Sequence, residues 1–152
     1  MQDNSLINPE ARAMVGAETP LGEPLEVEIG AVLKFYSSIG FDLPNLETKR
    51  DKKKKKFEVP AIFLDYNIPS GDEREITDKI PLPVQNRMRV KDEIELIHPI
   101  YTGDTIRAKT RIVDMFEKDG KTGRLVFILT ETEYINQHDV VVRKHCITSI
   151  RR

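Results

Sequence analysis

The chain has 152 residues, of which 39% are hydrophobic and 32% charged, and its formal net charge is −1. This length favours a single domain with a full core, and the small net charge excludes a whole-molecule field that would attract nucleic acid or an anionic membrane. The one cysteine, Cys146, excludes an internal disulfide and a multi-cysteine metal site.

No apolar run approaches the roughly 20 residues that cross a membrane. The start of the chain also lacks the basic-then-apolar pattern of a secretion signal. We therefore expect a cytoplasmic protein that binds neither membrane nor nucleic acid.

Residues 1–24 are polar and contain several prolines and glycines, which predicts an N-terminal arm. Asn8 followed by Pro9 predicts one helical turn over Pro9–Met14, and the rest of the arm is expected to be extended. Residues 25–152 are then expected to form the single folded domain.

The domain begins with the alternating segment Leu25–Ile29, which predicts a short strand. Helical spacing of apolar residues then predicts a helix over 31–39 that ends at Gly40. The lysine run Lys52–Lys56 predicts a solvated loop because adjacent like charges repel, although the same charges could steer an anion.

Residues 60–67 predict a short helix, since Pro60 suits a first helical turn and Pro69 stops the helix early. The charged, proline-bearing residues 69–86 predict an exposed loop. Its carboxylates Asp72, Glu73 and Glu75 favour solvation over metal binding.

Four strands follow. Residues 88–96 alternate apolar and charged side chains up to a break at Asp92, and Pro99 ends that run. Gly103-Asp104 predicts a turn into Thr105–Glu117, with Ile106, Ala108, Ile112 and Phe116 on the buried face. Asp119-Gly120 predicts a hairpin to Arg124–Asn136, and the last strand spans Val140–Ile150. The scattered His98, His138 and His145 are expected to be packing or surface residues.

Pro99–Ile106, in which a proline and a short spacer precede Gly-Asp and a long strand, resembles a corner of the MaoC-like acyl-thioester hydratases and dehydratases. The segments 15–18 (VGAE) and Phe35–Gly40 resemble the opening of the family's FAS1-like, N-terminal branch, and Val59–Tyr66 resembles the start of its central helix. This resemblance covers most of residues 14–151. It implies an α+β hot-dog fold, in which an antiparallel sheet curls around a short central helix.

Catalytic members of this family carry a Gly-Asp-x-Asn-Pro-x-His loop after the first helix, and its Asp and His hold the water that adds across the enoyl double bond. In this chain the loop reads Gly40-Phe-Asp-Leu-Pro-Asn-Leu46. Asp42 and Asn45 are the catalytic candidates, but their order differs from the motif and no histidine follows. The alternative is a plain proline-containing loop.

The resemblance leaves two hypotheses open. In the first, the chain is the non-catalytic acyl-binding subunit of a hetero-oligomeric 3-hydroxyacyl-CoA or -ACP dehydratase (enoyl-CoA hydratase), and a MaoC-domain partner supplies Asp and His. In the second, it is a self-sufficient homo-oligomeric enzyme, either a hydratase with a rearranged site or an acyl-CoA thioesterase. Both imply a coenzyme A or acyl-carrier-protein thioester as substrate, with no other cofactor and no metal.

The resemblance also suggests substrate-binding residues. Lys52, Lys53, Lys54, Lys55 and Lys56 are candidates for binding coenzyme A phosphates or an acidic carrier protein. Pro60, Phe63 and Tyr66 are candidates for the acyl pocket. The apolar segments Val126–Leu129 and Val140–Val142 exceed what one short helix can cover, so we expect a dimer or larger assembly through a sheet edge.

Overall fold

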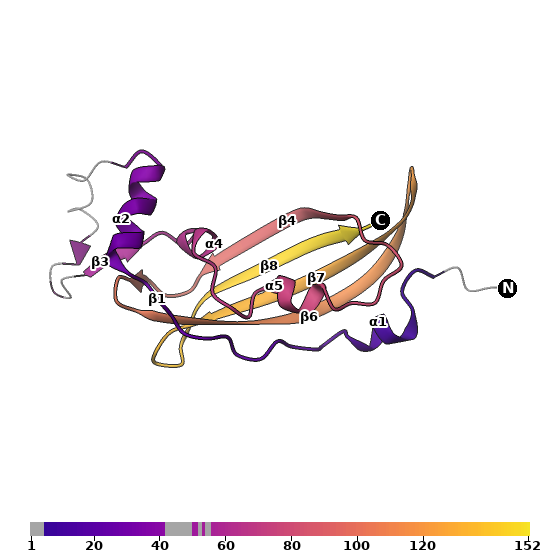
Figure 1. Ribbon diagram of the computed structural model, residues 1–152, viewed down its shortest axis with the longest axis horizontal. Coiled ribbons are helices and arrows are strands. Elements are labelled where there is room, and N and C mark those ends of the chain that lie inside the picture. The colour runs from indigo at the N-terminus through magenta and orange to yellow at the C-terminus, as the bar shows by residue number, and fades with distance from the viewer. Residues whose placement is uncertain (1–4, 42–49, 52, 54–55) are drawn as a thin grey trace.

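The computed structural model describes residues 5–41, 50–51, 53 and 56–152. Its main element is a curled antiparallel sheet of five strands (Figure 1). The strands, in sheet order, are β1 (Leu25–Glu26), β6 (Thr105–Gly120), β7 (Gly123–Ile135), β8 (Val141–Arg151) and β4 (Arg87–Leu96). The predicted curled sheet is confirmed.

A second, smaller sheet lies near one end of the large one. Its strands, in order, are β2 (Arg50–Asp51), β3 (Lys56–Val59) and β5 (Ile100–Tyr101). The helices are α1 (Pro9–Ala13), α2 (Ile29–Ser38), α4 (Phe63–Tyr66) and α5 (Glu73–Thr77). No helix in the described ranges is long and apolar enough to span a membrane.

The N-terminal arm, residues 5–24, runs along the outer edge of β6 (Figure 1). Its predicted helical turn is confirmed, because the Asn8 side chain accepts a hydrogen bond from the Ala11 amide at 2.7 Å. Beyond this turn, the Gly16, Thr19 and Gly22 amides each donate to a β6 carbonyl at 2.8–2.9 Å. The arm therefore pairs with β6 edge carbonyls that would otherwise face solvent.

The arm passes close to Gly71, which has a φ of +86°. A Cβ at this position would lie 2.2 Å from the Ala108 carbonyl oxygen. Only glycine combines this backbone conformation with such a close approach. Gly71 thus allows α5, the arm and β6 to meet.

Two apolar clusters form the core on the concave face of the sheet. The first joins α2 and α4 to the sheet and includes Phe35, Phe63, Leu64, Ile106 and Val142. The second joins α1 and α5 to the sheet and includes Ile7, Ala11, Ile76, Val126 and Ile128. The expectation that one short helix leaves residues 126–129 under-covered is therefore wrong for Val126 and Ile128, because α1 and α5 cover them.

Two further predictions are corrected. Residues 69–86 are not simply an exposed loop, since α5 follows the N-cap Asp72, and Ile76, Ile80 and Leu82 are buried in the second apolar cluster. Phe116 is not on the buried face. The pairing register of β6 with β7 shifts between Ile112 and Asp114, and this shift turns Met115 inward. The Phe116 ring instead stacks on the Phe127 ring, with 5.1 Å between the ring centres.

The opposite edge of the sheet is different. β4 pairs with β8 and, within the described residues, with no other strand. Nine of its ten residues are exposed. The sequence predicted alternation here, but no element in the described ranges covers either face of the strand well enough to bury one set of side chains.

Candidate functional site

Between the two apolar clusters, the concave face of the sheet is polar. Thr110, Thr132 and His145 lie side by side on β6, β7 and β8, and all three are buried. The Thr110 hydroxyl lies 2.7 Å from that of Thr132 and donates to the Gly71 carbonyl at 2.8 Å. This row places a histidine where a core would otherwise be apolar.

His145 lies between two carboxylates. Its Nε2 is 2.7 Å from Asp92 Oδ1, and its Nδ1 is 3.5 Å from Asp65 Oδ1. Asp92 comes from β4 and Asp65 from α4, and only 4% of the His145 surface is exposed. A carboxylate that bonds one ring nitrogen orients the imidazole and leaves the other nitrogen to face a ligand or water.

Arg143 lies one row away and is fully buried. Its Nη2 donates to Asp65 Oδ2 at 2.5 Å, and its guanidinium lies 4.5 Å from the centre of the Tyr134 ring. Its Nε and Nη1 have no hydrogen-bond partner in the described part of the chain. Burial raises the pKa of Tyr134, against the opposing effect of Arg143.

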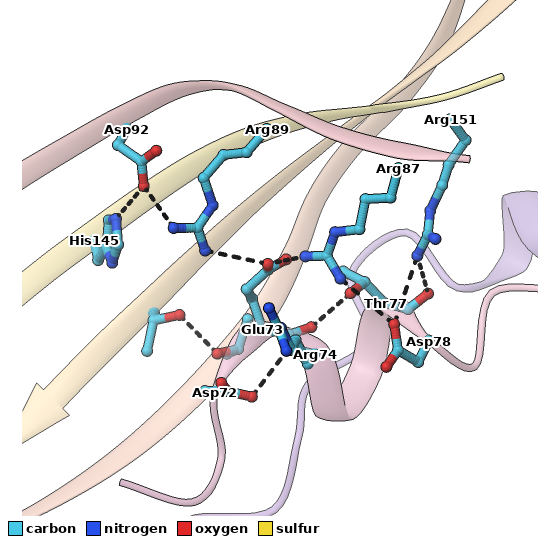
Figure 2. Close-up of polar contacts among 12 residues, drawn as sticks. Asp72, Glu73, Arg74, Thr77, Asp78, Arg87, Arg89, Asp92, His145 and Arg151 are labelled. Atoms are coloured by element: carbon cyan, nitrogen blue, oxygen red, sulfur yellow. Dashed lines mark hydrogen bonds and ion pairs between the residues drawn. The ribbon is translucent and has the colours of Figure 1, made fainter. Parts of the chain in front are cut away.

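Beyond Asp92, a chain of ion pairs leads to α5 (Figure 2). Arg89 lies 3.3 Å from Asp92 and 3.4 Å from the buried Glu73, which also pairs with Arg87. Burial, followed by the nearby Arg151 and Arg89, lowers the pKa of Arg87. These pairs tie α5 to the concave side of β4.

A cavity of about 70 Å³ opens in this region, which we call the His145 site. Its lining includes Asp65, Glu73, Arg89, Thr132, Tyr134 and His145. The cavity is large enough to admit water. The site can hold a water beside the Asp65 carboxylate and the His145 imidazole, but a whole acyl thioester does not fit in it.

The predicted acyl-pocket residues do not share one cavity. Phe63 is fully buried in the first apolar cluster, whereas Tyr66 is 55% exposed, and both rings contact Phe35. Pro60 instead lines a separate hollow of about 220 Å³, the Pro60 hollow, with Tyr36, Ile39, Phe41, Glu58 and Val59. The Tyr36 hydroxyl donates to the Glu58 carbonyl at 2.9 Å. Burial, and then Glu58, raise the pKa of Tyr36.

The lysine run is only partly described. Lys52, Lys54 and Lys55 lie outside the described residues, as do the catalytic candidates Asp42 and Asn45. Lys53 is exposed. Lys56 begins β3, and its Nζ lies 3.8 Å from Asp104 Oδ1 in a hollow of about 370 Å³ that also contains Tyr101 and His138.

Sequence reasoning missed the convergence of Asp65, Asp92 and His145. His98 and His138 are exposed, but His145 is buried and bonded to Asp92. The sequence did contain an indication. Alternate residues of a strand point to the same face, so Arg143, His145 and Ser149 lie on the same, inward face of the last strand as the apolar Ile147. No group of three or more His, Cys, Asp or Glu among the described residues could hold a metal ion. Near Asp72, the side chains of Asp72 and Glu75 accept backbone hydrogen bonds instead.

Comparisons with known proteins give a family for this chain and solved structures of similar fold. The family model described as "FAS1-like, dehydratase domain region" matches residues 13–145. No curated protein sequence matches the chain. The solved structures show similarity in fold at low sequence identity.

Three solved structures illustrate this similarity in fold. The truncated HadBC (3R-hydroxyacyl-ACP dehydratase) complex of Mycobacterium tuberculosis has 14% identity and a TM-score of 0.69, over 90% of this chain and 96% of that one. The ChsH1–ChsH2 complex of the same organism has 10% identity and a TM-score of 0.69, over 93% and 90%. The R-hydratase PhaJ1 of Pseudomonas aeruginosa has 14% identity and a TM-score of 0.60, over 90% and 81%.

Proposed function

Starting from the premise that this chain belongs to the FAS1-like, dehydratase domain region family, we propose that it is the non-catalytic acyl-binding subunit of a hetero-oligomeric 3-hydroxyacyl-thioester dehydratase. The observation that carries this proposal is the small and already hydrogen-bonded His145 site. There, Asp92 occupies one ring nitrogen, Arg143 occupies one oxygen of Asp65, and the cavity is about 70 Å³. The loop Gly40–Leu46 also contains no histidine. A partner subunit therefore supplies the acid–base pair.

The acyl-binding part of the proposal rests on β3. This strand has Lys56 at its start, and Val59 at its end lines the largely apolar Pro60 hollow. A thioester lying along β3 would place its acyl group in the hollow and its anionic carrier near Lys56. Charge steering and apolar burial would then act on opposite ends of one ligand.

Two of the structural neighbours support the subunit role. HadBC and ChsH1–ChsH2 are both complexes of different chains. In such a complex, a hot-dog chain without the family's loop histidine can serve as the non-catalytic subunit, because the second chain can carry the catalytic motif.

The test is hydration of crotonyl-CoA and longer enoyl-CoA, followed by loss of the enoyl absorbance. The chain alone should show almost no turnover. Adding a MaoC-domain protein from the same genome, with its Asp and His intact, should bring turnover into the usual enzyme range of about 1–10³ per second. Turnover by the chain alone that disappears in Asp42→Asn would contradict the non-catalytic role.

A second candidate function is favoured by one specific contact, between Asp65 and His145. His145 Nδ1 and Asp65 Oδ1 face the same cavity, and Asp92 orients the ring. This arrangement could activate a water in a self-sufficient hydratase or thioesterase. Loss of a general acid–base group typically costs about 10²–10⁴-fold in rate.

Variants at these two positions separate the candidates. If the chain alone hydrates enoyl-CoA or releases free coenzyme A, then Asp65→Asn and His145→Gln should each abolish that activity. Asp42→Asn should leave the activity unchanged. Melting curves of the same samples show whether the loss comes from unfolding.

A further inference from the structure

The convex face of the large sheet, which points away from both apolar clusters, has an apolar row of its own. Phe116 on β6 pairs in register with Phe127 on β7. Phe127 also pairs with Ile150 on β8, which in turn pairs with Met88 on β4. These four residues, which we call the outer row, belong to neither apolar cluster, whereas both neighbours of Phe127 along β7 belong to the second one. Because successive strand residues point to opposite faces, the outer row crosses four adjacent strands on the convex side.

The outer row is only partly covered within the chain. Phe116 and Phe127 remain half-buried although their rings stack on each other, and Met88 is 46% exposed. On β7, the half-buried Leu125 and Leu129 continue the apolar surface to either side of Phe127. Aromatic side chains and methionine are enriched in the cores of protein interfaces, where they exclude water. The outer row therefore has the composition of an interface core.

Two opposite charges lie at equal spacing on either side of this surface. On β6, Asp114 comes two positions before Phe116 and pairs with Leu129, and Lys118 comes two positions after it and pairs with Leu125. Lys118 Nζ lies 5.3 Å from the centre of the Phe116 ring. Neither Asp114 nor Lys118 takes part in an ion pair within the described part of the chain. Both charges are thus available to a second molecule.

This pattern is complementary to itself when it is turned by 180°. A twofold axis that runs along the outer row, between two sheets stacked face to face, reverses the strand direction of the second copy. Asp114 of one copy then faces Lys118 of the other, and Leu125 of one copy faces Leu129 of the other. If the two β6 strands ran parallel instead, each charge would face its own kind, which is unfavourable.

From these observations we propose that the outer row is the contact surface between two copies of this chain, stacked sheet to sheet with antiparallel strand directions about a twofold axis. The occupant is a second copy because the surface supplies its own complement, apolar to apolar and charge to opposite charge. This inference goes beyond the proposed function and does not depend on it, since the contact lies on the convex face, away from the His145 site and the Pro60 hollow, and uses no backbone group of either sheet edge.

Sedimentation equilibrium at micromolar concentration tests the proposal by a ratio of masses. The chain mass is 17.5 kDa, and the wild type should have twice the mass of Lys118→Asp and of Asp114→Lys at the same concentration. Each variant places like charges opposite one another, which should weaken the contact about tenfold or more. Phe127→Thr removes the ring but keeps a residue suited to a strand, and it should also halve the mass. Because only the ratio is read, the result does not depend on any further association through a sheet edge.

A control and a charge exchange separate the proposed contact from a loss of folding. The matched control Arg107→Glu reverses an exposed charge on the same face of β6, at its other end, and should keep the wild-type mass. Combining Asp114→Lys with Lys118→Asp in one chain exchanges the two charges and should restore association, as should an equimolar mixture of the two single variants. Melting curves of dilute samples check that each variant folds.

Three results would overturn the proposal. The first is an equal mass for the wild type and Lys118→Asp, which would leave the outer row to a different protein or to solvent. The second is a charge-exchanged double variant that is no heavier than the single ones. The third is a control, Arg107→Glu, that lowers the mass as much as Lys118→Asp does.

Discussion

The two edges of the sheet are built in opposite ways. At β6, the chain uses its own N-terminal arm to bond the edge carbonyls and to bury Ile7 and Ala11. At β4, whose inner side pairs with β8, the outer side of the ten-residue strand has no neighbouring strand in the described part of the chain. One edge is therefore completed within the chain, and the other is available for another molecule.

This difference shows where stability and association reside. Residues of the arm contribute to folding of the single chain, because they are buried in it. Residues of β4 bury less of their surface in the single chain, because nine of the ten residues of this strand are exposed. Four sets of substitutions can break or sharpen this contrast.

The largest effect is expected for Gly71→Ala, at the point where the arm crosses. The new Cβ would lie 2.2 Å from the Ala108 carbonyl oxygen, in a backbone with positive φ. We expect a loss of about 3–5 kcal/mol in unfolding free energy, measured by urea denaturation. Gly16→Ala is the matched control, because Gly16 also has a positive φ but nothing within 4 Å of its Cβ. It should cost about 1 kcal/mol, and equal losses would show that the crossing contact is unimportant.

Next is Ile7→Ala, compared with Met88→Ala. Ile7 is 6% exposed and packs in the second apolar cluster, so its truncation should cost about 2–4 kcal/mol. Met88 is 46% exposed at the β4 edge, and its truncation should change the unfolding free energy of the monomer by less than about 0.5 kcal/mol. Thermal or urea unfolding at concentrations below dimerisation measures both. Similar costs at both positions would remove the contrast between the edges.

The polar site beside β4 should give a smaller effect. Asp65→Asn removes the charge that pairs with the fully buried Arg143 guanidinium. Breaking a buried pair typically costs about 3–5 kcal/mol, but Asp65 is partly exposed, so we expect about 2 kcal/mol. Adding Arg143→Met to Asp65→Asn should recover part of that loss. A double variant less stable than the single one would show that Arg143 packing, rather than its charge, dominates.

The smallest effect on stability is expected for Lys52–Lys55 replaced by serine, with Lys56 kept because it pairs with Asp104. Because the sequence predicts a solvated loop here, each substitution should change the unfolding free energy by no more than about 0.5 kcal/mol. Binding of a coenzyme A ester should weaken, and the deficit should shrink as salt rises, because exposed charges are screened over about 8–10 Å. Equal affinity of variant and wild type at low salt would leave the run without a binding role.

The sequence was most informative where signals are local. Alternation and the Asp119-Gly120 turn predicted the long strands β6, β7 and β8, and Asn8-Pro9 predicted α1. Local signals failed at α5, where charges and prolines concealed the buried Ile76, and at the β6 register shift, which no residue type announces.

The candidate site was harder to predict because its residues come together only through the tertiary fold. Asp65, Asp92 and His145 come from α4, β4 and β8, and no spacing in the sequence relates them. The family resemblance predicts one acyl pocket for Pro60, Phe63 and Tyr66. The helix turns them toward Phe35 instead, while Pro60 faces a different hollow.

Amide hydrogen exchange of the wild-type chain, recorded at high and low protein concentration, tests the contrast between the edges most directly. Amides of the arm that bond β6, such as Gly16 and Thr19, should be protected equally at both concentrations. The β4 amides that do not bond β8 should be protected at high concentration and exchange rapidly on dilution below the dimerisation constant. Protection of β4 that does not change with concentration, or arm amides that exchange as fast as the free β4 edge, would contradict this account.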